Sequence, residues 1–220
     1  MTSYIYNFFK VLNLIISGTK LTRPFSIELK GKLRVGKNVS IGRNVSFSGK
    51  VLLGDNVVIE EGCILSSCSV SDSVLIKSNS IIEDSIISKE TFIGPYARVR
   101  SKVFIGESCQ IGNFVEIKNS NINSGCRLNH MAFIGDSDLE KDVTIGAGVI
   151  TCNHDGKNIQ RTVIGQGAYI GSNSNLIAPI KIGANATIGS GSTITKDVVP
   201  NELTLARTKQ ITVSNWKRKT

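Results

Sequence analysis

The chain has 220 residues, of which 40% are hydrophobic, 20% charged and 6% aromatic, and its 21 glycines and 4 prolines follow no collagen-like or low-complexity pattern. This composition excludes fibrous and intrinsically disordered classes and predicts a globular protein with a hydrophobic core. The net charge of +9 is concentrated at the two ends, since residues 1–34 hold six basic groups against Glu28 and residues 203–220 hold five and no acid. With few aromatic residues for base stacking, this distribution argues against a nucleic-acid partner.

Cysteine and histidine are too sparse for a disulfide scaffold or a zinc site. The five cysteines contain no C-x-x-C pair, and the two histidines are His130 and His154. No apolar run reaches the roughly 18 residues that cross a bilayer, and the apolar N-terminal stretch lacks the basic start of a signal peptide. We therefore expect a cytoplasmic protein with no membrane span and no structural metal.

The first predicted element is an amphipathic helix from about residue 3 to residue 17, within an N-terminal helix and lead-in over residues 1–34. Apolar residues recur at spacings of three and four from Ile5 to Ile16, and Gly18 follows as a C-cap. We expect the helix to pack on the following domain or on a neighbouring subunit. Attachment to a membrane surface is the weaker alternative, because the polar face holds one lysine, Lys10.

Residues 35–199 carry an aliphatic residue at nearly every sixth position. Of 26 positions in this register, from Val35 to Ile194, 25 are Val, Ile or Leu and the exception is Phe47. A period of six fits neither an α-helix nor a hairpin ladder, but it fits a chain that turns a corner after each short strand. Three such hexads make one triangular coil. The repeat predicts an all-β protein, a parallel β-helix of eight to nine coils.

Three further features complete the repeat. The fourth residue after each aliphatic is usually small or β-branched, so we interpret Cys63, Cys109 and Cys126 as inward packing residues. A loop over residues 151–162 interrupts the register and is expected to protrude. The repeat ends at Pro200, and residues 200–220 form a basic C-terminal arm.

Ordered motifs within the repeat point to one family. They are GPYARVR at residues 94–100, GNFVEIK at 112–118, NH at 129–130, IGD at 134–136, IGAG at 145–148 and TCNHDG at 151–156. Together they resemble the acetyltransferase domain of the bacterial bifunctional N-acetylglucosamine-1-phosphate uridyltransferase/glucosamine-1-phosphate N-acetyltransferase, within the hexapeptide-repeat acyltransferases. The resemblance runs from about Leu12 to Trp216 and implies a left-handed coil. The uridyltransferase half of that family has no counterpart in these residues, so a separate uridyltransferase is a candidate partner.

The resemblance implies transfer of acetyl from acetyl-CoA to the amine of glucosamine 1-phosphate, in a site between adjacent prisms of a homotrimer. It assigns His130 as the catalytic base, a role that suits a group titrating near neutral pH. It assigns Arg100 and Lys118 to the sugar phosphate, where two cations can converge on one anion. Contacts with acetyl-CoA fall to the Ala147 backbone N–H, which faces the thioester carbonyl, and to Ser172, Ser190 and Arg207.

Several positions on the sugar side depart from the family pattern. Phe133 and His154 stand where the family has tyrosines, Thr144 replaces an asparagine and Ile159 replaces a lysine, whereas Asn153 is retained. Lost hydrogen bonds to substrate can change acceptor preference by orders of magnitude. A different amino sugar, or a nucleotide-linked one used in surface polysaccharide, is therefore an alternative acceptor. A non-catalytic scaffold or partner-binding subunit is the alternative of another class, and the retained motifs argue against it.

Overall fold

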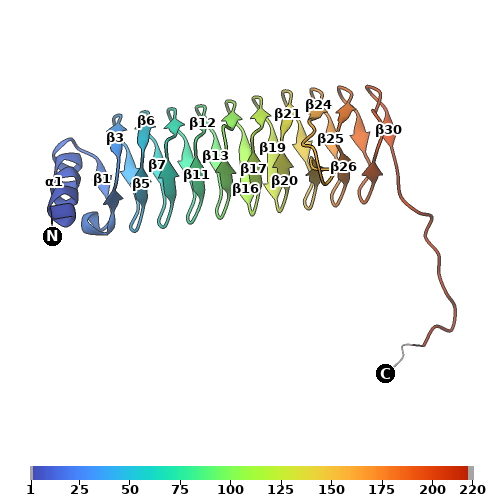
Figure 1. Cartoon of the computed structure of the whole chain (residues 1–220), viewed down its shortest axis with the longest axis horizontal. Helices are drawn as coiled ribbons and strands as arrows, with labels where there is room; N and C mark the ends of the chain where they lie inside the picture. The colour runs from blue at the N-terminus through green and yellow to red at the C-terminus, as the bar shows by residue number, and fades with distance from the viewer. Residues whose placement is uncertain (1, 218–220) are drawn as a thin grey trace.

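Short strands separated by corners run through almost the whole chain, of which the structure describes residues 2–217, with side chains from residue 7 onward. In this computed structural model each strand has two to four residues, and successive strands enter three different sheets in turn. Figure 1 shows the coils stacked in one row, with helix α1 (Thr2–Ile16) at one end and an extended C-terminal segment at the other. The parallel β-helix that the repeat predicts is confirmed.

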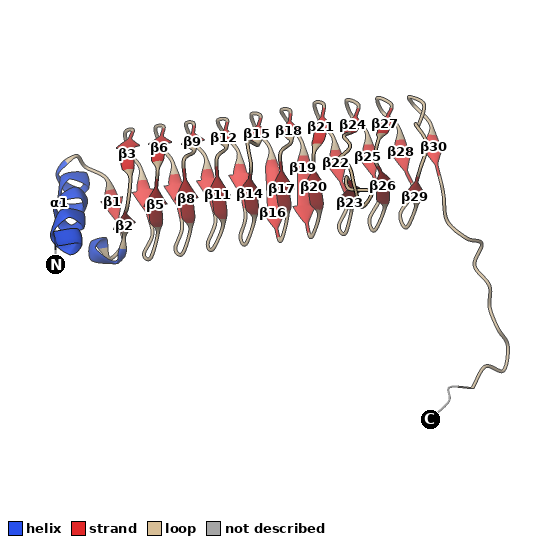
Figure 2. Cartoon of the chain, in the orientation of Figure 1, coloured by secondary structure: helices blue, strands red, loops and turns tan. Residues whose placement is uncertain are grey.

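The strands of the described residues form three parallel sheets, one for each side of the coil (Figure 2). Sheet A has eleven strands: β1 (Lys20–Leu21), β4 (Ser40–Ile41), β7 (Val58–Ile59), β10 (Leu75–Ile76), β13 (Phe92–Ile93), β16 (Gln110–Asn113), β19 (Arg127–His130), β22 (Thr144–Ile145), β25 (Tyr169–Ile170), β28 (Thr187–Ile188) and β30 (Leu203–Thr204). Sheet B has ten: β2 (Glu28–Leu29), β5 (Ser46–Ser48), β8 (Ile64–Ser66), β11 (Ile81–Glu83), β14 (Arg98–Arg100), β17 (Glu116–Lys118), β20 (Phe133–Gly135), β23 (Ile150–Cys152), β26 (Asn175–Ile177) and β29 (Thr193–Ile194). Sheet C has nine: β3 (Lys32–Val35), β6 (Lys50–Leu53), β9 (Ser69–Val70), β12 (Ile86–Ile87), β15 (Phe104–Ile105), β18 (Asn121–Ile122), β21 (Ser137–Leu139), β24 (Thr162–Ile164) and β27 (Ile180–Ile182).

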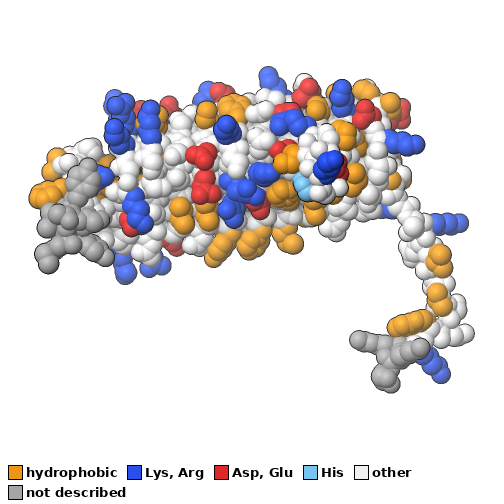
Figure 3. Space-filling view, in the orientation of Figure 1, with side chains coloured by type: hydrophobic (Ala, Val, Ile, Leu, Met, Phe, Trp, Pro, Cys, Tyr) orange, Lys and Arg blue, Asp and Glu red, His pale blue; other side chains and the backbone are white. Residues whose placement is uncertain are grey.

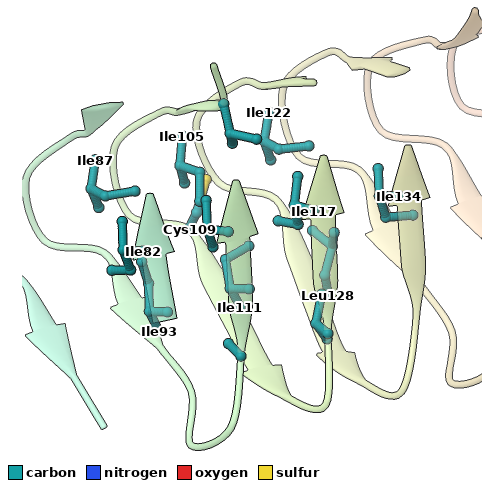
Figure 4. Close-up of a cluster of buried hydrophobic side chains, with 14 of the residues drawn as sticks. Ile82, Ile87, Ile93, Ile105, Cys109, Ile111, Ile117, Ile122, Leu128 and Ile134 are labelled. Carbon is teal, nitrogen blue, oxygen red and sulfur yellow. The ribbon is translucent and has the colours of Figure 1, made fainter. Parts of the chain in front are cut away.

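The six-residue register places the aliphatic side chains in columns inside the coil. Ile93 pairs with Ile111 in the next coil, and Ile111 pairs with Leu128 in the coil after that. Of the 26 register positions, 25 are buried, and the exception is the half-buried Val35. Figure 4 shows the register side chains of the middle coils, from Ile82 to Ile134, filling the space between the sheets together with Cys109. Each contributes about 1.5–3 kcal/mol by leaving water, which makes the columns the main source of stability.

The inward packing role predicted for three cysteines is confirmed, because Cys63, Cys109 and Cys126 are fully buried. The number of coils was underestimated, since three sheets of nine to eleven strands give about ten coils rather than eight to nine. β1 pairs with β4 and β2 with β5, so the coil begins well before residue 35. The six-residue repeat does not reveal this first coil, because a 3-10 turn over Pro24–Ser26 lengthens the spacing between inward residues.

Helix α1 covers the N-terminal end of the coil, within one residue of the predicted bounds. The Asn7 carboxamide donates to the carbonyl of Ile27 at 2.9 Å and accepts from the backbone N–H of Leu29 at 2.8 Å. Lys10 Nζ donates to the carbonyl of Gly31 at 3.0 Å. The helix thereby satisfies backbone groups that a bare strand edge would leave unpaired. No helix among the described residues is long and apolar enough to cross a membrane.

Candidate active site

The corner that leads from sheet A to sheet B carries His130 in one coil and Ala147 in the next. Asn113 and His130 are paired residues of β16 and β19. The backbone N–H of Gly148 donates to the carbonyl of Met131 at 3.0 Å, which fixes the two corners one above the other. The same corner continues in the following coils, where the N–H of Asn173 donates to the carbonyl of Ala147 at 2.7 Å.

The imidazole of His130 is exposed and held at one nitrogen. Its Nδ1 lies 2.7 Å from Oδ1 of Asn113. A carboxamide oxygen only accepts, so this contact selects the tautomer with the proton on Nδ1 and leaves Nε2 free to take a proton. The ring borders a shallow hollow of about 320 Å³, lined by Phe92, Gly94, Pro95, Gly112, Asn113, Asn129 and His130. A small polar ligand has access to the unprotonated nitrogen from this side.

The turn that contains Ala147 exposes a backbone donor. The N–H groups of its two flanking glycines are used, since Gly146 donates to the carbonyl of Ile170 and Gly148 to that of Met131. Within residues 2–217, no acceptor pairs with the N–H of Ala147. A free N–H at a tight corner is suited to a developing oxyanion.

Ser172, Ser190 and Arg207 continue the Ala147 row toward the C-terminal end. The backbones of these corners are so close that a Cβ added to Gly146 would lie 2.5 Å from the nitrogen of Ser172, and one added to Gly171 would lie 2.5 Å from that of Ser190. Arg207 Nη1 donates to the carbonyl of Ser190 at 3.0 Å. The predicted acetyl-CoA contacts therefore form one continuous line along the coil.

The two cations predicted to bind a phosphate lie at the other ends of the sheet B strands, where the chain turns toward sheet C. These strand ends are the second edge of sheet B, opposite the His130 corner. Arg100 and Lys118 are paired residues at the ends of β14 and β17. Each already has one carboxylate partner, because Arg100 Nε donates to Glu116 Oε1 at 2.7 Å and Lys118 Nζ lies 3.4 Å from Asp136 Oδ2. Figure 3 shows Lys and Arg side chains gathered with Asp and Glu over the middle coils of one face. The remaining N–H groups of both cations are available to an anion.

Asp136 is the buried centre of this edge, with 2% of its surface exposed. Asn119 Nδ2 donates to one of its oxygens and Asn153 Nδ2 to the other, each at 2.5 Å. Burial alone would raise the pKa of Asp136, but these two amides and Lys118 hold it below its ordinary value. The group is therefore a carboxylate at neutral pH.

Phe133 lies on the outward face of β20, between the two edges of sheet B. A Cβ added to Gly135 would lie 2.7 Å from Cε1 of the Phe133 ring and 2.9 Å from Asn153 Nδ2. The ring and the amide therefore meet above a glycine that leaves room for both. Thr144 lies elsewhere, on sheet A between Arg127 and Tyr169.

The protruding loop occupies residues 153–161, slightly fewer than the predicted 151–162, because Thr151 and Thr162 belong to strands. His154 and Ile159 face each other as an isolated antiparallel bridge. His154 is exposed, and its Nδ1 accepts from the backbone N–H of Gly156 at 3.2 Å. Among the described residues, no group of His, Cys, Asp and Glu is placed to hold a metal ion.

Two protein-family models match parts of this chain, the GMPPB C-terminal domain over residues 29–104 and the bacterial transferase hexapeptide (six repeats) over residues 161–196. The chain is 42% identical over 215 residues to the bifunctional protein GlmU of Pseudoalteromonas atlantica, covering 98% of this chain and 48% of that protein. It is 43% identical over 205 residues to the bifunctional protein GlmU of Herminiimonas arsenicoxydans, covering 93% and 45%. The chain is a homologue of GlmU.

The chain spans about half the length of these GlmU relatives. Among solved structures, the fold matches a UDP-N-acetylglucosamine acyltransferase from Francisella novicida with a TM-score of 0.61 at 16% identity, covering 84% of this chain and 66% of that one. Because the sequence identity is only 16%, this structural similarity shows a common fold and nothing more. The resemblance inferred from the motifs is thus confirmed by similarity over nearly the whole chain.

In this GlmU homologue the structure sorts the predicted residues into two groups on either side of β20. His130, Ala147, Ser172, Ser190 and Arg207 follow one corner, Arg100, Lys118 and Asn153 lie at the other edge of sheet B, and Phe133 lies on β20 between the two groups. Thr144 and the exposed His154 join neither group within one chain. Sequence reasoning gave no role to Asn113, Glu116 and Asp136, although all three lie inside the quoted motifs or directly beside them. Their place in those motifs was the one signal that the sequence offered.

Proposed function

We propose that the chain is an acetyl-CoA-dependent N-acetyltransferase of an amino-sugar phosphate, with glucosamine 1-phosphate as the leading acceptor. The observation that carries the proposal is the stacking of His130 and Ala147 in successive coils, with Nδ1 of His130 held by Asn113. This arrangement supplies a proton acceptor and an oxyanion donor side by side. Acyl transfer from a thioester to an amine needs both.

Each group has a defined part in such a transfer. His130 Nε2 takes a proton from the acceptor amine as its nitrogen bonds to the carbonyl carbon of the thioester. The Ala147 N–H donates to the carbonyl oxygen while it carries negative charge. When the carbon–sulfur bond breaks, the protonated His130 returns the proton to the leaving thiolate. Asn113 keeps the imidazole in the tautomer that this cycle requires.

The second group of residues supports an acceptor that carries a phosphate. Arg100 and Lys118 converge at one edge of sheet B, and the three residues of β20 separate them from the His130 corner by about 10 Å. A sugar phosphate placed across the Phe133 face would put its anion at the cations and its amine toward His130. Phe133 offers an apolar surface to the sugar ring rather than a hydroxyl.

A homotrimer is part of the same proposal, with the site closed by an adjacent copy. The corner beside His130 exposes Tyr96, Phe114 and Met131 in successive coils, each more than half exposed. The rings of Tyr96 and Phe114 stack with their centroids 5.5 Å apart. A continuous exposed apolar ridge supports burial against another chain. Sedimentation at micromolar concentration should give three times the chain mass, and a monomer would count against this arrangement.

Free-thiol release from acetyl-CoA tests the activity against a panel of glucosamine 1-phosphate, glucosamine 6-phosphate, galactosamine 1-phosphate and UDP-linked amino sugars. Turnover with glucosamine 1-phosphate alone is the expected result. Turnover only with another amine would support the second candidate, an acceptor change that Phe133 favours because it removes a phenol hydroxyl. No turnover together with no thermal shift by acetyl-CoA would support a scaffold, since a bound ligand raises apparent stability.

A further inference from the structure

We propose that Asp136 is a positioning residue for acceptor binding, which holds the Asn153 carboxamide and the Lys118 ammonium in the orientation that the acceptor meets. The proposal rests on the proposed function, because it concerns the acceptor edge of that site. Asp136 itself is buried and does not touch the acceptor. Its effect passes through the side chains that it holds.

Asp136 has a full set of partners around its two oxygens. One oxygen accepts from Asn119 Nδ2 at 2.5 Å, and the other accepts from Asn153 Nδ2 at 2.5 Å and faces Lys118 Nζ at 3.4 Å. The side chain of Asp136 is 4% exposed and that of Lys118 is 26% exposed. The carboxylate therefore lies beneath the cation and the amide, at a depth that a ligand does not reach.

The contact between Asp136 and Asn153 decides which end of the Asn153 carboxamide faces outward. An ionised carboxylate only accepts hydrogen bonds, so it attracts the NH₂ end of the amide and repels the oxygen end. With Nδ2 turned to Asp136, the Asn153 oxygen is presented at the surface as an acceptor. The ring of Phe133 lies beside the same amide nitrogen and limits other orientations. A sugar hydroxyl or ammonium is the kind of group that this oxygen would bind.

The contact of Asp136 with Lys118 fixes the position of the Lys118 ammonium in the same way. Lysine has a flexible stem and three donors. With one donor directed at Asp136, the other two are turned toward solvent at the edge where Arg100 lies in the neighbouring coil. The pKa of Asp136 lies below its ordinary value despite burial, because Asn119, Asn153 and Lys118 stabilise the charged form. The orientation of both partners thus persists over the whole neutral range.

The test compares Asp136→Asn with Asp138→Asn in the full-length protein. Asp138 is the matched control because it lies two residues away and binds the other end of the same loop through Arg161, without touching Asn153 or Lys118. We expect Asp136→Asn to raise KM for the acceptor about tenfold or more. KM for acetyl-CoA should stay within about twofold, because the Ala147 row, which is proposed to bind acetyl-CoA, lies on the other corner. Asp138→Asn should leave both constants within about twofold.

A double-mutant cycle separates positioning from general weakening. Asp136→Asn should raise the acceptor KM of Asn153→Ala by a smaller factor than it raises that of the wild type, because part of its effect acts through Asn153 and the rest through Lys118. Equal increases in both KM values, a matching effect of Asp138→Asn, or full additivity with Asn153→Ala would overturn the proposal. If Asp136→Asn does not fold, Asn119→Ala removes one partner of the carboxylate without removing its charge. It should raise the acceptor KM in the same direction by a smaller factor, and an unchanged KM would count against Asp136.

A second readout does not depend on turnover. The side-chain amide resonances of Asn153 in nitrogen-15 spectra, assigned with Asn153→Ala, should move in Asp136→Asn and stay in place in Asp138→Asn. Unmoved resonances in Asp136→Asn would overturn the positioning role. An inactive wild-type protein would instead count against the proposed function, and this spectrum would still decide whether Asp136 orients Asn153.

Discussion

Arg161 binds Asp138 through two parallel hydrogen bonds and closes the protruding loop onto the coil. Its Nε donates to one carboxylate oxygen at 2.8 Å and its Nη2 to the other at 2.5 Å. The hydrogen bonds from Arg161 hold the pKa of Asp138 below its ordinary value. Because Asn153 at the start of the loop binds Asp136, two carboxylates that lie two residues apart in the chain hold both ends of the loop.

Replacement of Arg161 by alanine should loosen the loop while the coil stays intact. Both partners are more than a third exposed, so we expect a stability loss of less than about 1 kcal/mol. Amide hydrogen exchange should rise at residues 155–160 and remain unchanged in the strands of the middle coils. Arg161→Lys is the matched control, because it keeps the charge and loses the paired geometry. Unchanged exchange in Arg161→Ala would show that the pair does not hold the loop.

Removal of the proposed base should abolish most of the turnover. We expect His130→Ala to lower kcat by about a hundredfold to ten-thousandfold, the usual contribution of a positioned base. Asn113→Ala should lower kcat by a smaller factor, because the ring remains but loses the partner of Nδ1. Both variants should sediment as the wild type does, since both side chains lie at the surface of a corner. A His130→Ala enzyme with the wild-type rate would remove the base from the mechanism.

The fold was predictable because it depends on one repeated feature. An aliphatic side chain at every sixth position points into the interior of the coil, and 25 of these 26 positions are buried. The first coil was not predictable, because the 3-10 turn at Pro24–Ser26 breaks the spacing without breaking the coil. The C-terminal arm was predicted as residues 200–220, but β30 within it still pairs with β28, and residues 218–220 lie outside the described residues.

The site residues could be predicted only where they belong to a recognised sequence motif. The row from His130 to Arg207 follows from motif and register together, since residues at equivalent corners of successive coils must stack. Asp136 could not be recognised from the sequence, because its role depends on Asn119 and Asn153, which the chain brings to one corner from 17 residues away on either side. A period of six residues shows which side chains point inward but not which surface amides meet. The positions of Thr144 and His154 relative to an acceptor stay predictions.

Stability should fall at acid pH partly through Asp136. Its pKa is lowered in the folded state, so the ionised group stabilises the fold above the ordinary aspartate pKa of about 3.9. This contribution is lost as the pH falls from about 4 through the lower folded value. The melting temperature of the wild type should therefore decline over that range more steeply than that of Asp136→Asn. Parallel curves for the two proteins would show that Asp136 does not contribute to acid sensitivity.

The cysteines should differ sharply in their reactivity toward thiol reagents. Burial raises the pKa of Cys63 to about 11 and that of Cys68 to about 12, whereas Cys152 is only partly buried. At pH 8 we expect a disulfide reagent to modify Cys152 first and the buried cysteines only after unfolding in urea. Since Cys152 precedes Asn153 in the chain, a bound acceptor should slow this first modification. Rapid modification of Cys63 in the native protein would contradict the closed packing of the coil.

Restoring the family residues on the sugar side should redirect the acceptor preference. Phe133→Tyr adds a hydroxyl on the outward face of β20, and Thr144→Asn adds a carboxamide on β22. If these positions set the choice of acceptor, the double variant should raise kcat/KM for glucosamine 1-phosphate relative to the other amines by about tenfold or more, the effect of a hydrogen bond gained to a substrate hydroxyl. Thiol release against the same panel measures this ratio.

Phe25→Tyr serves as the control for this exchange. Phe25 is an exposed phenylalanine in the 3-10 turn of the first coil, several coils away from both groups of site residues, so a hydroxyl there should leave the ratio unchanged. A ratio that does not move in the double variant would place the choice of acceptor elsewhere. The protruding loop would then be the next segment to exchange, because Ile159 stands where the family has a lysine and a lost cation weakens binding of an anionic acceptor.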